Sequence, residues 1–268
     1  MIIKSKEEND EFKNIIKSKK FNVKVDYDTS KVSKPEKIIY KYNENIMKKF
    51  IELSKEYGFI NIGFTKVSPD VILNNTKLEY DNAIILVHEI PDRLMETEPG
   101  DLAKLYSDNF YEELANKTYA LSDFLRKNNV DTETIHPEYD EFINFSKIAA
   151  KANLGGIGGS GLLIRPELGP KVKFSVILTS MDLPNKEVKE DYSWIKEYCK
   201  RCNKCAKACE YNALTEDTFN RKKCKGCNEG CTYCINACPF YKKGYDNIKR
   251  KFIKYNEKME KKLKKQNK

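Results

Sequence analysis

The order of hydrophobic and polar residues predicts alternating helices and strands over the first two thirds of the chain. Apolar side chains recur every three or four positions from Lys37 to Tyr57 and from Leu102 to Asn128, which predicts two amphipathic helices. Three short apolar segments predict strands, at Phe59–Thr65, Ala83–His88 and Val172–Thr179, and the second is expected to be covered on both faces. The pattern therefore predicts an α+β fold for this part of the chain.

A glycine-rich segment lies between these elements. A loop at Ile135–Asp140 and a short helix at Phe142–Ala152 lead directly into Asn153–Ile164, and six of the twelve glycines lie between Gly155 and Gly169. Glycine allows the backbone to approach a ligand closely or to turn left-handed. The segment does not match the dinucleotide-binding fingerprint, because it follows a helix and leads into a strand.

Basic charge is concentrated at the C-terminus. Residues 241–268 carry 12 basic and 3 acidic residues and account for the net charge of +9, while residues 1–240 carry 37 of each sign. The same region predicts an amphipathic helix whose apolar stripe consists of Ile248, Phe252, Tyr255, Met259 and Leu263. Such a helix could pack on the core, lie on an anionic membrane, contact RNA phosphates or dock an acidic electron donor. Nothing in the sequence requires nucleic acid.

Hydropathy and cysteine usage both indicate a location in the cytoplasm. No segment approaches the roughly 20 apolar residues that a membrane span requires, and the N-terminus turns acidic without an apolar signal core. All nine cysteines lie between Cys199 and Cys238. This clustering is typical of metal binding in a reducing compartment and not of a disulfide framework.

The cysteine spacing predicts two [4Fe–4S] clusters in a ferredoxin-like module. Cys199 begins a C-x2-C-x2-C-x3-C motif, and Cys231 begins a C-x2-C-x3-C-P motif, the two halves of a two-cluster ferredoxin. Paired C-x2-C units also bind zinc, but three consecutive short steps fit a zinc site poorly. In the crossed arrangement one cluster is held by Cys199, Cys202, Cys205 and Cys238. The other is held by Cys209, Cys231, Cys234 and either Cys224 or Cys227, and spacing alone slightly favours Cys227 because it is nearer.

The order of these motifs resembles the superfamily of epoxyqueuosine reductases and respiratory reductive dehalogenases. The resemblance is carried by Ala152–Val172 with its glycines, by Ile177–Ser180 and by the double cysteine motif, and it extends to Tyr57–Phe64 and Tyr80–Val87. It covers about residues 38–243. It implies a nitroreductase-like core that binds cobalamin, to which the clusters deliver electrons. On this basis we expect an N-terminal, loosely attached extension (1–35), a corrinoid-binding domain (36–190), a ferredoxin-like domain (191–243) and a basic tail (244–268).

The resemblance also implies roles for particular residues. The isolated cluster ligand of the family sits in a basic stretch like Arg221–Cys224, which favours Cys224 over Cys227. The proton donor of the family lies just before the helix that enters the glycine segment, where this chain has Tyr139 and Asp140, with His136 in the same loop. The corrinoid contacts implied by the family are Leu154, Gly155, Gly156, Ile157, Gly158, Gly159, Ser160 and Gly161.

The chain also departs from the family pattern. Gly156 and Gly159 stand where the family has larger residues, and Glu210 replaces a proline after Cys209. We expect a shorter branch without the helical-repeat extension. The resemblance implies an oxidoreductase that uses a ferredoxin- or flavodoxin-type donor to reduce a small-molecule or nucleoside-like substrate on cobalamin. The alternatives are an activator that reduces a partner corrinoid protein or flavoprotein, and a flavin-binding variant of the same fold.

Overall fold

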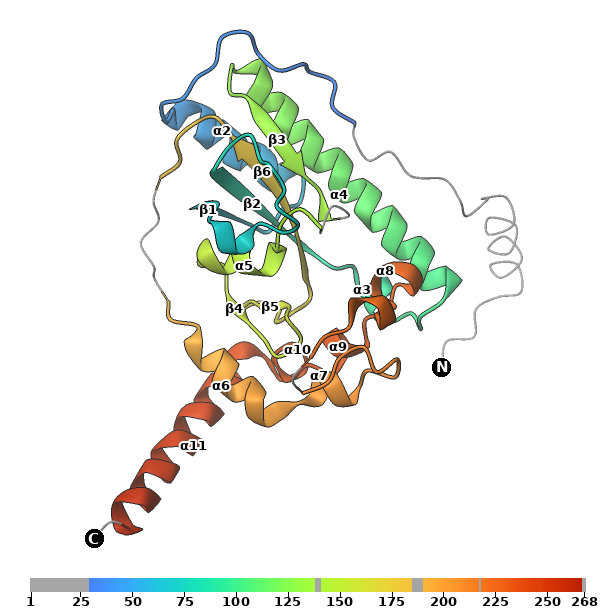
Figure 1. Ribbon diagram of the computed structural model, residues 1–268, viewed down its shortest axis with the longest axis vertical. Coiled ribbons are helices and arrows are strands. Elements are labelled where there is room, and N and C mark those ends of the chain that lie inside the picture. Colours follow the sequence, from blue (N-terminus) through green and yellow to red (C-terminus); the bar gives the residue numbers. More distant parts are fainter. Residues whose placement is uncertain (1–28, 138–140, 185–189, 217, 267–268) are drawn as a thin grey trace.

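The computed structural model describes residues 29–137, 141–184, 190–216 and 218–266. An α+β body occupies the upper part of Figure 1, a group of short helices lies below it, and one helix projects from the lower end. The body is built on a four-stranded antiparallel sheet with the strand order β1-β2-β6-β3. Its strands are β1 (Asn61–Lys66), β2 (Asn82–Glu89), β3 (Thr132–Ile135) and β6 (Val172–Thr179). The predicted α+β class is confirmed.

The central strands of the sheet are buried on both faces. Helices α2 (Glu44–Glu56) and α4 (Asp101–Lys127) cover one face, where they pack on Ile84 and Leu86. Helix α5 (Phe145–Lys151) covers the other face, on the side of Ala83, Ile85 and Val87. Successive side chains of a strand point to opposite faces. Strand β2 therefore supplies both cores, which explains its unbroken apolar run and confirms that it is covered on both sides.

Two helices begin later than their hydrophobic pattern predicts. Helix α2 begins at Glu44 rather than at Lys37, because the side chain of Asn43 accepts an amide hydrogen bond of the first turn and caps the helix. Helix α5 also begins three residues late, after Asn144, which caps it in the same way. Helix α4 and strand β6 match their predicted ranges within one residue.

Three short strands were not predicted. Strand β3 includes Ile135, which was expected to lie in a loop, and it pairs with β6 at an edge of the sheet. Strands β4 (Gly156–Ile157) and β5 (Leu163–Ile164) form a hairpin inside the glycine-rich segment. We call residues 155–164 the glycine hairpin.

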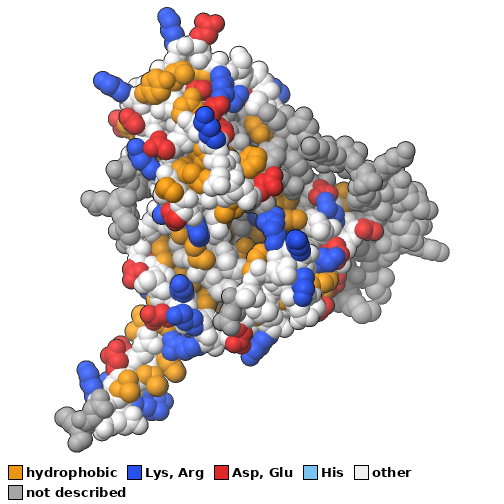
Figure 2. All heavy atoms as spheres, in the orientation of Figure 1, with side chains coloured by type: hydrophobic (Ala, Val, Ile, Leu, Met, Phe, Trp, Pro, Cys, Tyr) orange, Lys and Arg blue, Asp and Glu red, His pale blue; other side chains and the backbone are white. Residues whose placement is uncertain are grey.

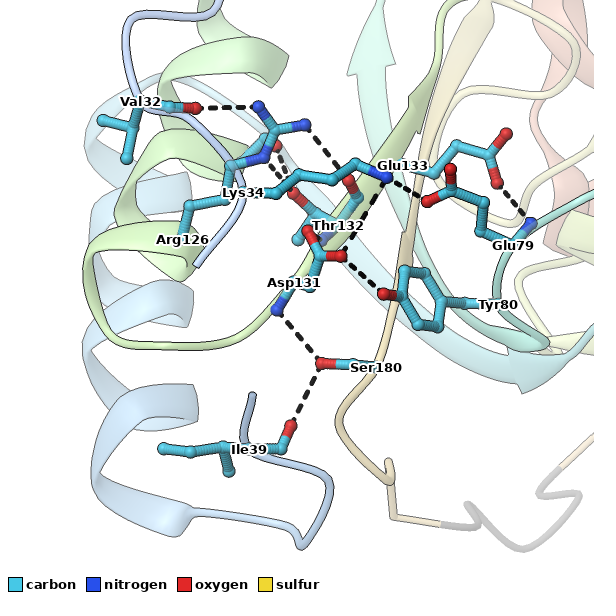
Figure 3. Close-up of polar contacts among 11 residues, drawn as sticks. Val32, Lys34, Ile39, Glu79, Tyr80, Arg126, Asp131, Thr132, Glu133 and Ser180 are labelled. Atoms are coloured by element: carbon cyan, nitrogen blue, oxygen red, sulfur yellow. Dashed lines mark hydrogen bonds and ion pairs between the residues drawn. The ribbon is translucent and has the colours of Figure 1, made fainter. Parts of the chain in front are cut away.

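The described residues before α2 are hydrogen-bonded to the body, so the prediction of a loosely attached extension is wrong for residues 29–35. The buried carboxylate of Asp123 on α4 accepts hydrogen bonds from the backbone amides of Lys31 (2.9 Å) and Val32 (3.1 Å). Arg126 donates to the carbonyl of Val32 at 2.8 Å (Figure 3). This segment is part of the fold.

A network of polar groups lies at the end of the sheet where β2 begins and β6 ends (Figure 3). The Tyr80 hydroxyl donates to the buried Asp131 carboxylate at 2.5 Å. Burial of the phenol raises the pKa of Tyr80 most, and this hydrogen bond raises it further. The Asp131 amide donates to Ser180 Oγ, which in turn donates to the carbonyl of Ile39, both at 3.0 Å. The network therefore joins strands β3 and β6 to the chain that leads into α2.

Replacing Asp123 by alanine should lower the free energy of unfolding by about 1–3 kcal/mol, because two backbone amides would lose their buried acceptor. Urea denaturation measures this loss. Glu112→Ala, at an exposed position of the same helix, is the matched control and should change stability by less than about 0.5 kcal/mol. An equal effect of both variants would contradict the role of Asp123.

The C-terminal part consists of short helices followed by a long one. They are α6 (Ser193–Cys202), α7 (Lys204–Lys207), η3 (Arg221–Lys223), α8 (Gly226–Glu229), α9 (Tyr233–Asn236), α10 (Pro239–Lys243) and α11 (Tyr245–Gln266). The body contains two further short helices, η1 (Pro69–Val71) and α3 (Asp92–Met95). Helix α11 confirms the predicted tail helix. Among the residues that are described, no helix combines the length and the apolar character needed to cross a membrane.

Candidate iron–sulfur site

Three of the first four cysteines lie on two helices joined by a tight turn, and the fourth follows the second helix. Cys199 and Cys202 are in the last turn of α6, Cys205 is on α7, and Cys209 follows it. Asn203 between the helices has a left-handed backbone (φ 50°), which reverses the chain directly after Cys202. The turn therefore brings Cys205 back toward the end of α6 that carries Cys199 and Cys202, and these three thiols interact electrostatically.

The remaining cysteines lie on the helices that follow. Cys224 ends η3, Cys227 is on α8, Cys231 and Cys234 lie at α9, and Cys238 is the N-cap residue of α10, directly before Pro239. Gly230 turns the chain between α8 and α9, with φ 64°. This glycine packs against the backbone of Ala103 on α4, so the segment around α8 and α9 is in direct contact with the α+β body.

The thiols form two electrostatically coupled groups, each drawn from both halves of the motif. In the first group Cys199 interacts with Cys202 and Cys205, and Cys238 interacts with Cys199 and Cys205. In the second group Cys231 and Cys234 both interact with Cys209 and Cys224, and Cys234 also interacts with Cys205 of the first group. Cys224 is half-buried beside these partners, whereas Cys227 is exposed. The geometry thus favours Cys224 over the choice made from spacing alone, and the assignment of these thiols as ligands stays a prediction.

Backbone amides point at the sulfur atoms. The sulfur of Cys224 accepts a hydrogen bond from the Gly226 amide at 3.5 Å, and the amides of Phe240 and Tyr241, at the start of α10, lie near the Cys238 sulfur and act to lower its pKa. Such N–H groups stabilise the negative charge of thiolate-bound clusters and help to set their potentials. The donor set therefore fits iron–sulfur clusters.

Burial opposes ionisation of these thiols in the protein alone. It raises the pKa of Cys199 to about 11 and the pKa values of Cys234 and Cys238 to about 12. Thiolates bind metals, whereas thiols do not. A bound cation would supply the positive charge that makes these buried sulfurs ionise.

Among the described residues, no three His, Cys, Asp or Glu side chains lie close enough together to hold a single metal ion. Each thiolate of a [4Fe–4S] cluster binds a different iron atom, so cluster ligands need not meet at one ion.

Tyr198 is a site residue that the sequence prediction missed. It lies four residues before Cys202 on α6, one helical turn away, and burial and the interaction of its hydroxyl with the Cys202 thiol raise the pKa of Tyr198. Its ring packs edge-on against Phe240, with centroids 5.3 Å apart. An aromatic residue one turn before a cysteine on a helix is a signal that could have identified it.

Replacing Tyr198 by phenylalanine should lower the reduction potential of the first cluster without loss of iron. A hydrogen bond to sulfur favours the more negative, reduced state, and its loss should cost about 20–60 mV, the one-electron equivalent of 0.5–1.5 kcal/mol. A redox titration followed by electron paramagnetic resonance measures the shift. Tyr211→Phe, whose hydroxyl faces Glu229, should leave the first cluster unchanged. A shift toward higher potential in Tyr198→Phe would contradict the assignment.

The glycine hairpin packs directly against α6. A Cβ atom at Gly156 would lie 2.8 Å from side-chain atoms of Tyr192 and Ile195. A Cβ atom at Gly159 would lie 3.3 Å from Cβ and 4.0 Å from Sγ of Cys199, and the nearby Gly159 amide acts to lower the pKa of this thiol, against the larger effect of burial. The hairpin therefore brings the α+β body into contact with the first cysteine group.

Comparisons with known proteins agree with this architecture. The family model of a 4Fe-4S binding domain matches residues 192–215, which include the first four cysteines. A tetrachloroethene reductive dehalogenase of Sulfurospirillum multivorans is 26% identical over 196 residues, covering 65% of this chain and 37% of its own length. The chain is thus a distant relative of the reductive dehalogenases and, in its fold, of the epoxyqueuosine reductases.

Solved structures of the superfamily share the fold. A reductive dehalogenase, for which a mechanism of B12-dependent dehalogenation has been suggested, matches with a TM-score of 0.59 at 18% identity, over 72% of this chain and 31% of its own. The epoxyqueuosine reductase of Streptococcus thermophilus matches with a TM-score of 0.55 at 20% identity, over 76% and 68%. The chain spans 37% of the length of the curated relative that it matches.

The structure places the residues predicted to contact the corrinoid of the superfamily in two environments. Leu154, Gly155, Gly156 and Gly158 are buried against protein atoms, and Ile157 is half-buried. The tip of the hairpin is different, because Gly159 and Gly161 are exposed and Ser160 is half-exposed. A Cβ atom at Gly161 would meet no described atom within 4 Å. The tip is therefore open to solvent, while close packing explains the buried glycines. All eight contacts stay predictions.

Two hollows among the described residues lie away from the tip. One, of about 650 Å³, is lined by Tyr40, Tyr80 and Asn82 at the end of the sheet where β2 begins and β6 ends. The other, of about 540 Å³, lies between α6 and α11 beside Trp194. The glycine hairpin lies beyond the opposite end of these strands (Figure 1).

The residues predicted to donate a proton are only partly described. Tyr139 and Asp140 lie outside the described residues. His136 is fully buried, and its Nε2 lies 3.0 Å from the carbonyl oxygen of Tyr111. Burial lowers the pKa of His136 to about 4, so its imidazole is neutral near pH 7. It is therefore a poor acid at that pH.

Proposed function

We propose that the chain is an iron–sulfur oxidoreductase that passes single electrons through two [4Fe–4S] clusters. Cys199, Cys202, Cys205 and Cys238 would hold the first cluster, and Cys209, Cys224, Cys231 and Cys234 would hold the second. The carrying observation is the contact between Cys199 and Gly159 at the hairpin tip, where an added Cβ atom would lie 3.3 Å from Cβ and 4.0 Å from Sγ of Cys199. It gives electrons of the first cluster a short path into the α+β body.

The two thiol groups are neighbours, so electrons could pass from one cluster to the other. Cys205 belongs to the first group and Cys209 to the second, and the two thiols interact electrostatically. The exit at the hairpin tip is exposed at Gly159 and Gly161. We therefore place the electron acceptor at this tip.

The acceptor that the relatives suggest is a corrinoid, held in a nitroreductase-like core. When bound, a corrinoid would supply low-valent cobalt for a two-electron reduction of a small-molecule or nucleoside-like substrate. Gly159, Ser160 and Gly161 would contact it, and the proton would come from Tyr139 or Asp140. All nine cysteines can remain reduced in the cytoplasm, where we expect the protein to act.

A second candidate function is supported by the packing of the hairpin. Gly155, Gly156 and Gly158 face protein atoms, so the abundance of glycine has an explanation that needs no cofactor. In this case the chain would be an activator that reduces a partner corrinoid protein or a flavoprotein docked at the tip. A flavin in place of the corrinoid is a third arrangement of the same site.

Metal analysis of anaerobically purified, reconstituted protein tests the proposal. We expect about eight iron atoms per chain, because two [4Fe–4S] clusters contain eight, and reduction by dithionite should bleach their absorbance. Zinc in place of iron would overturn it. One cobalt per chain, or cobalamin binding in an absorbance titration, supports the corrinoid enzyme. Iron without cobalt, together with a co-purifying corrinoid protein, supports the activator, and a flavin spectrum supports the third arrangement.

A further inference from the structure

Helix α11 has an inner half that packs and an outer half that projects. Ile248 and Phe252 are buried on the module, where the Phe252 ring lies 5.4 Å from Trp194 and 6.4 Å from Tyr198. Beyond Phe252 the helix extends away from the body, at the lower left of Figure 1. The inner half is therefore a structural anchor, and the outer half presents a surface.

The apolar stripe of α11 continues onto the projecting half. Tyr255, Met259 and Leu263 share the face that buries Phe252, but they are 47%, 38% and 55% exposed. Basic side chains flank this stripe, since α11 contains nine basic and three acidic residues. Figure 2 shows basic and apolar side chains together on this part of the molecule.

A second basic surface surrounds the cysteines of the first motif. Its exposed side chains are Lys196, Lys200, Arg201, Lys204 and Lys207, and four of them stand between the cysteines of the first motif. Arg201 joins this surface to the helix, because its guanidinium lies 4.5 Å from the centre of the Tyr255 ring and donates to Asn256 at 3.4 Å. We call the outer half of α11 and these five residues the basic docking surface.

We propose that the basic docking surface binds an acidic, low-potential electron-donor protein of the ferredoxin or flavodoxin type. This inference rests on the proposed electron-transfer function. A donor held there would face Cys202, Cys205 and Cys209, which belong to both thiol groups. Each encounter would oxidise the donor by one electron and reduce one [4Fe–4S] cluster from the 2+ to the 1+ state.

Charge and position favour this occupant over two others. A second copy of the chain would bring two rows of lysines together, which is repulsive. An anionic membrane would be attracted to α11, but it would give no reason for basic residues between the cysteines. Opposite charge on a redox partner accelerates its association and places it beside the cluster.

The test measures cluster reduction in the reconstituted holoprotein by a chemically reduced, acidic flavodoxin in stopped flow. The charge variant carries Lys254→Glu, Lys258→Glu and Lys262→Glu, and the apolar variant carries Met259→Gln and Leu263→Gln. The matched control reverses three exposed lysines on or beside α2, with Lys41→Glu, Lys48→Glu and Lys49→Glu. At low ionic strength the charge variant should react at least about tenfold more slowly, and the control within about twofold of the unchanged protein. The apolar variant should also react more slowly.

Dithionite separates failure of the docking surface from failure of the proposed function, because this small reductant needs no docking. It should reduce the clusters at equal rates in every variant. Absence of clusters would refute the proposed function, and with it this inference. Equal flavodoxin rates in all variants, with intact clusters, would overturn the docking surface alone. Two further results would overturn the docking surface. The first is that the unchanged protein cosediments with phosphatidylglycerol vesicles and the charge variant does not, while both react with flavodoxin at the same rate. The second is that the protein forms a dimer that the apolar variant, changed at Met259 and Leu263, does not form.

Discussion

Replacing Cys224 by serine should remove one of the two clusters and lower the iron content from about eight to about four atoms per chain. Cys224 lies beside Cys231 and Cys234, and the Gly226 amide donates to its sulfur. Serine offers a hard oxygen in place of a soft thiolate, so the second cluster should assemble poorly. Iron analysis and the intensity of the cluster absorbance measure the loss.

Cys227→Ser is the matched control, because it changes the same atom three residues away. Cys227 is exposed on α8, and the variant should retain about eight iron atoms. Loss of iron in Cys227→Ser and its retention in Cys224→Ser would contradict the assignment and restore the choice made from spacing. Retention of all iron in both variants would show that the second cluster uses another ligand.

The hydrophobic pattern predicted the elements that are buried on one or both faces. Strands β2 and β6 and helix α4 bury most of their apolar residues, so their periodicity is strong. Strand β3 was missed because Thr132, Glu133 and Thr134 are polar and the strand pairs with β6 alone. An edge strand needs few apolar residues, and its backbone hydrogen bonds to the sheet do not depend on which side chains it carries, so its position is hard to predict from the sequence.

Helix starts were predicted less well than helix faces. The apolar positions before Glu44 keep helical spacing, yet Ile39 donates its amide to Asn129 and accepts a hydrogen bond from Ser180. These contacts hold the segment outside the helix, and the Asn43 cap marks the true start. An N-cap asparagine is visible in a sequence, but the competing tertiary hydrogen bonds are not.

The candidate site was predictable as far as it depends on local spacing. Cysteines three or four residues apart must lie close together, but Cys205 and Cys209 belong to different groups, so the crossed groups followed from the two-cluster ferredoxin pattern. The choice of Cys224 required either family resemblance or the fold. The role of the glycines was not predictable, because it depends on the approach of α6 to the hairpin. Tertiary packing thus decided between two explanations that composition could not separate.

Replacing Gly155 by alanine should destabilise the protein strongly, by about 3–5 kcal/mol. Gly155 has φ 155°, and an added Cβ would lie 2.3 Å from the carbonyl oxygen of Ile164, an atom of the backbone that cannot move aside easily. The hairpin would have to shift, and with it the contact between Gly159 and Cys199. Thermal and urea unfolding measure the loss, and a lowered iron content should accompany it.

Gly161→Ala separates packing from ligand binding at the same hairpin. Gly161 also has a positive φ, of 78°, but an added Cβ meets no described atom within 4 Å, so the cost should be about 1 kcal/mol, that of the backbone conformation alone. If the tip contacts a corrinoid, Gly161→Ala should weaken cobalamin binding while it leaves iron content and folding nearly unchanged. If the chain is an activator, the same variant should instead slow electron transfer to the partner protein. Comparable destabilisation by both alanines would contradict the packing role of Gly155, because only that residue lies against the backbone of β5.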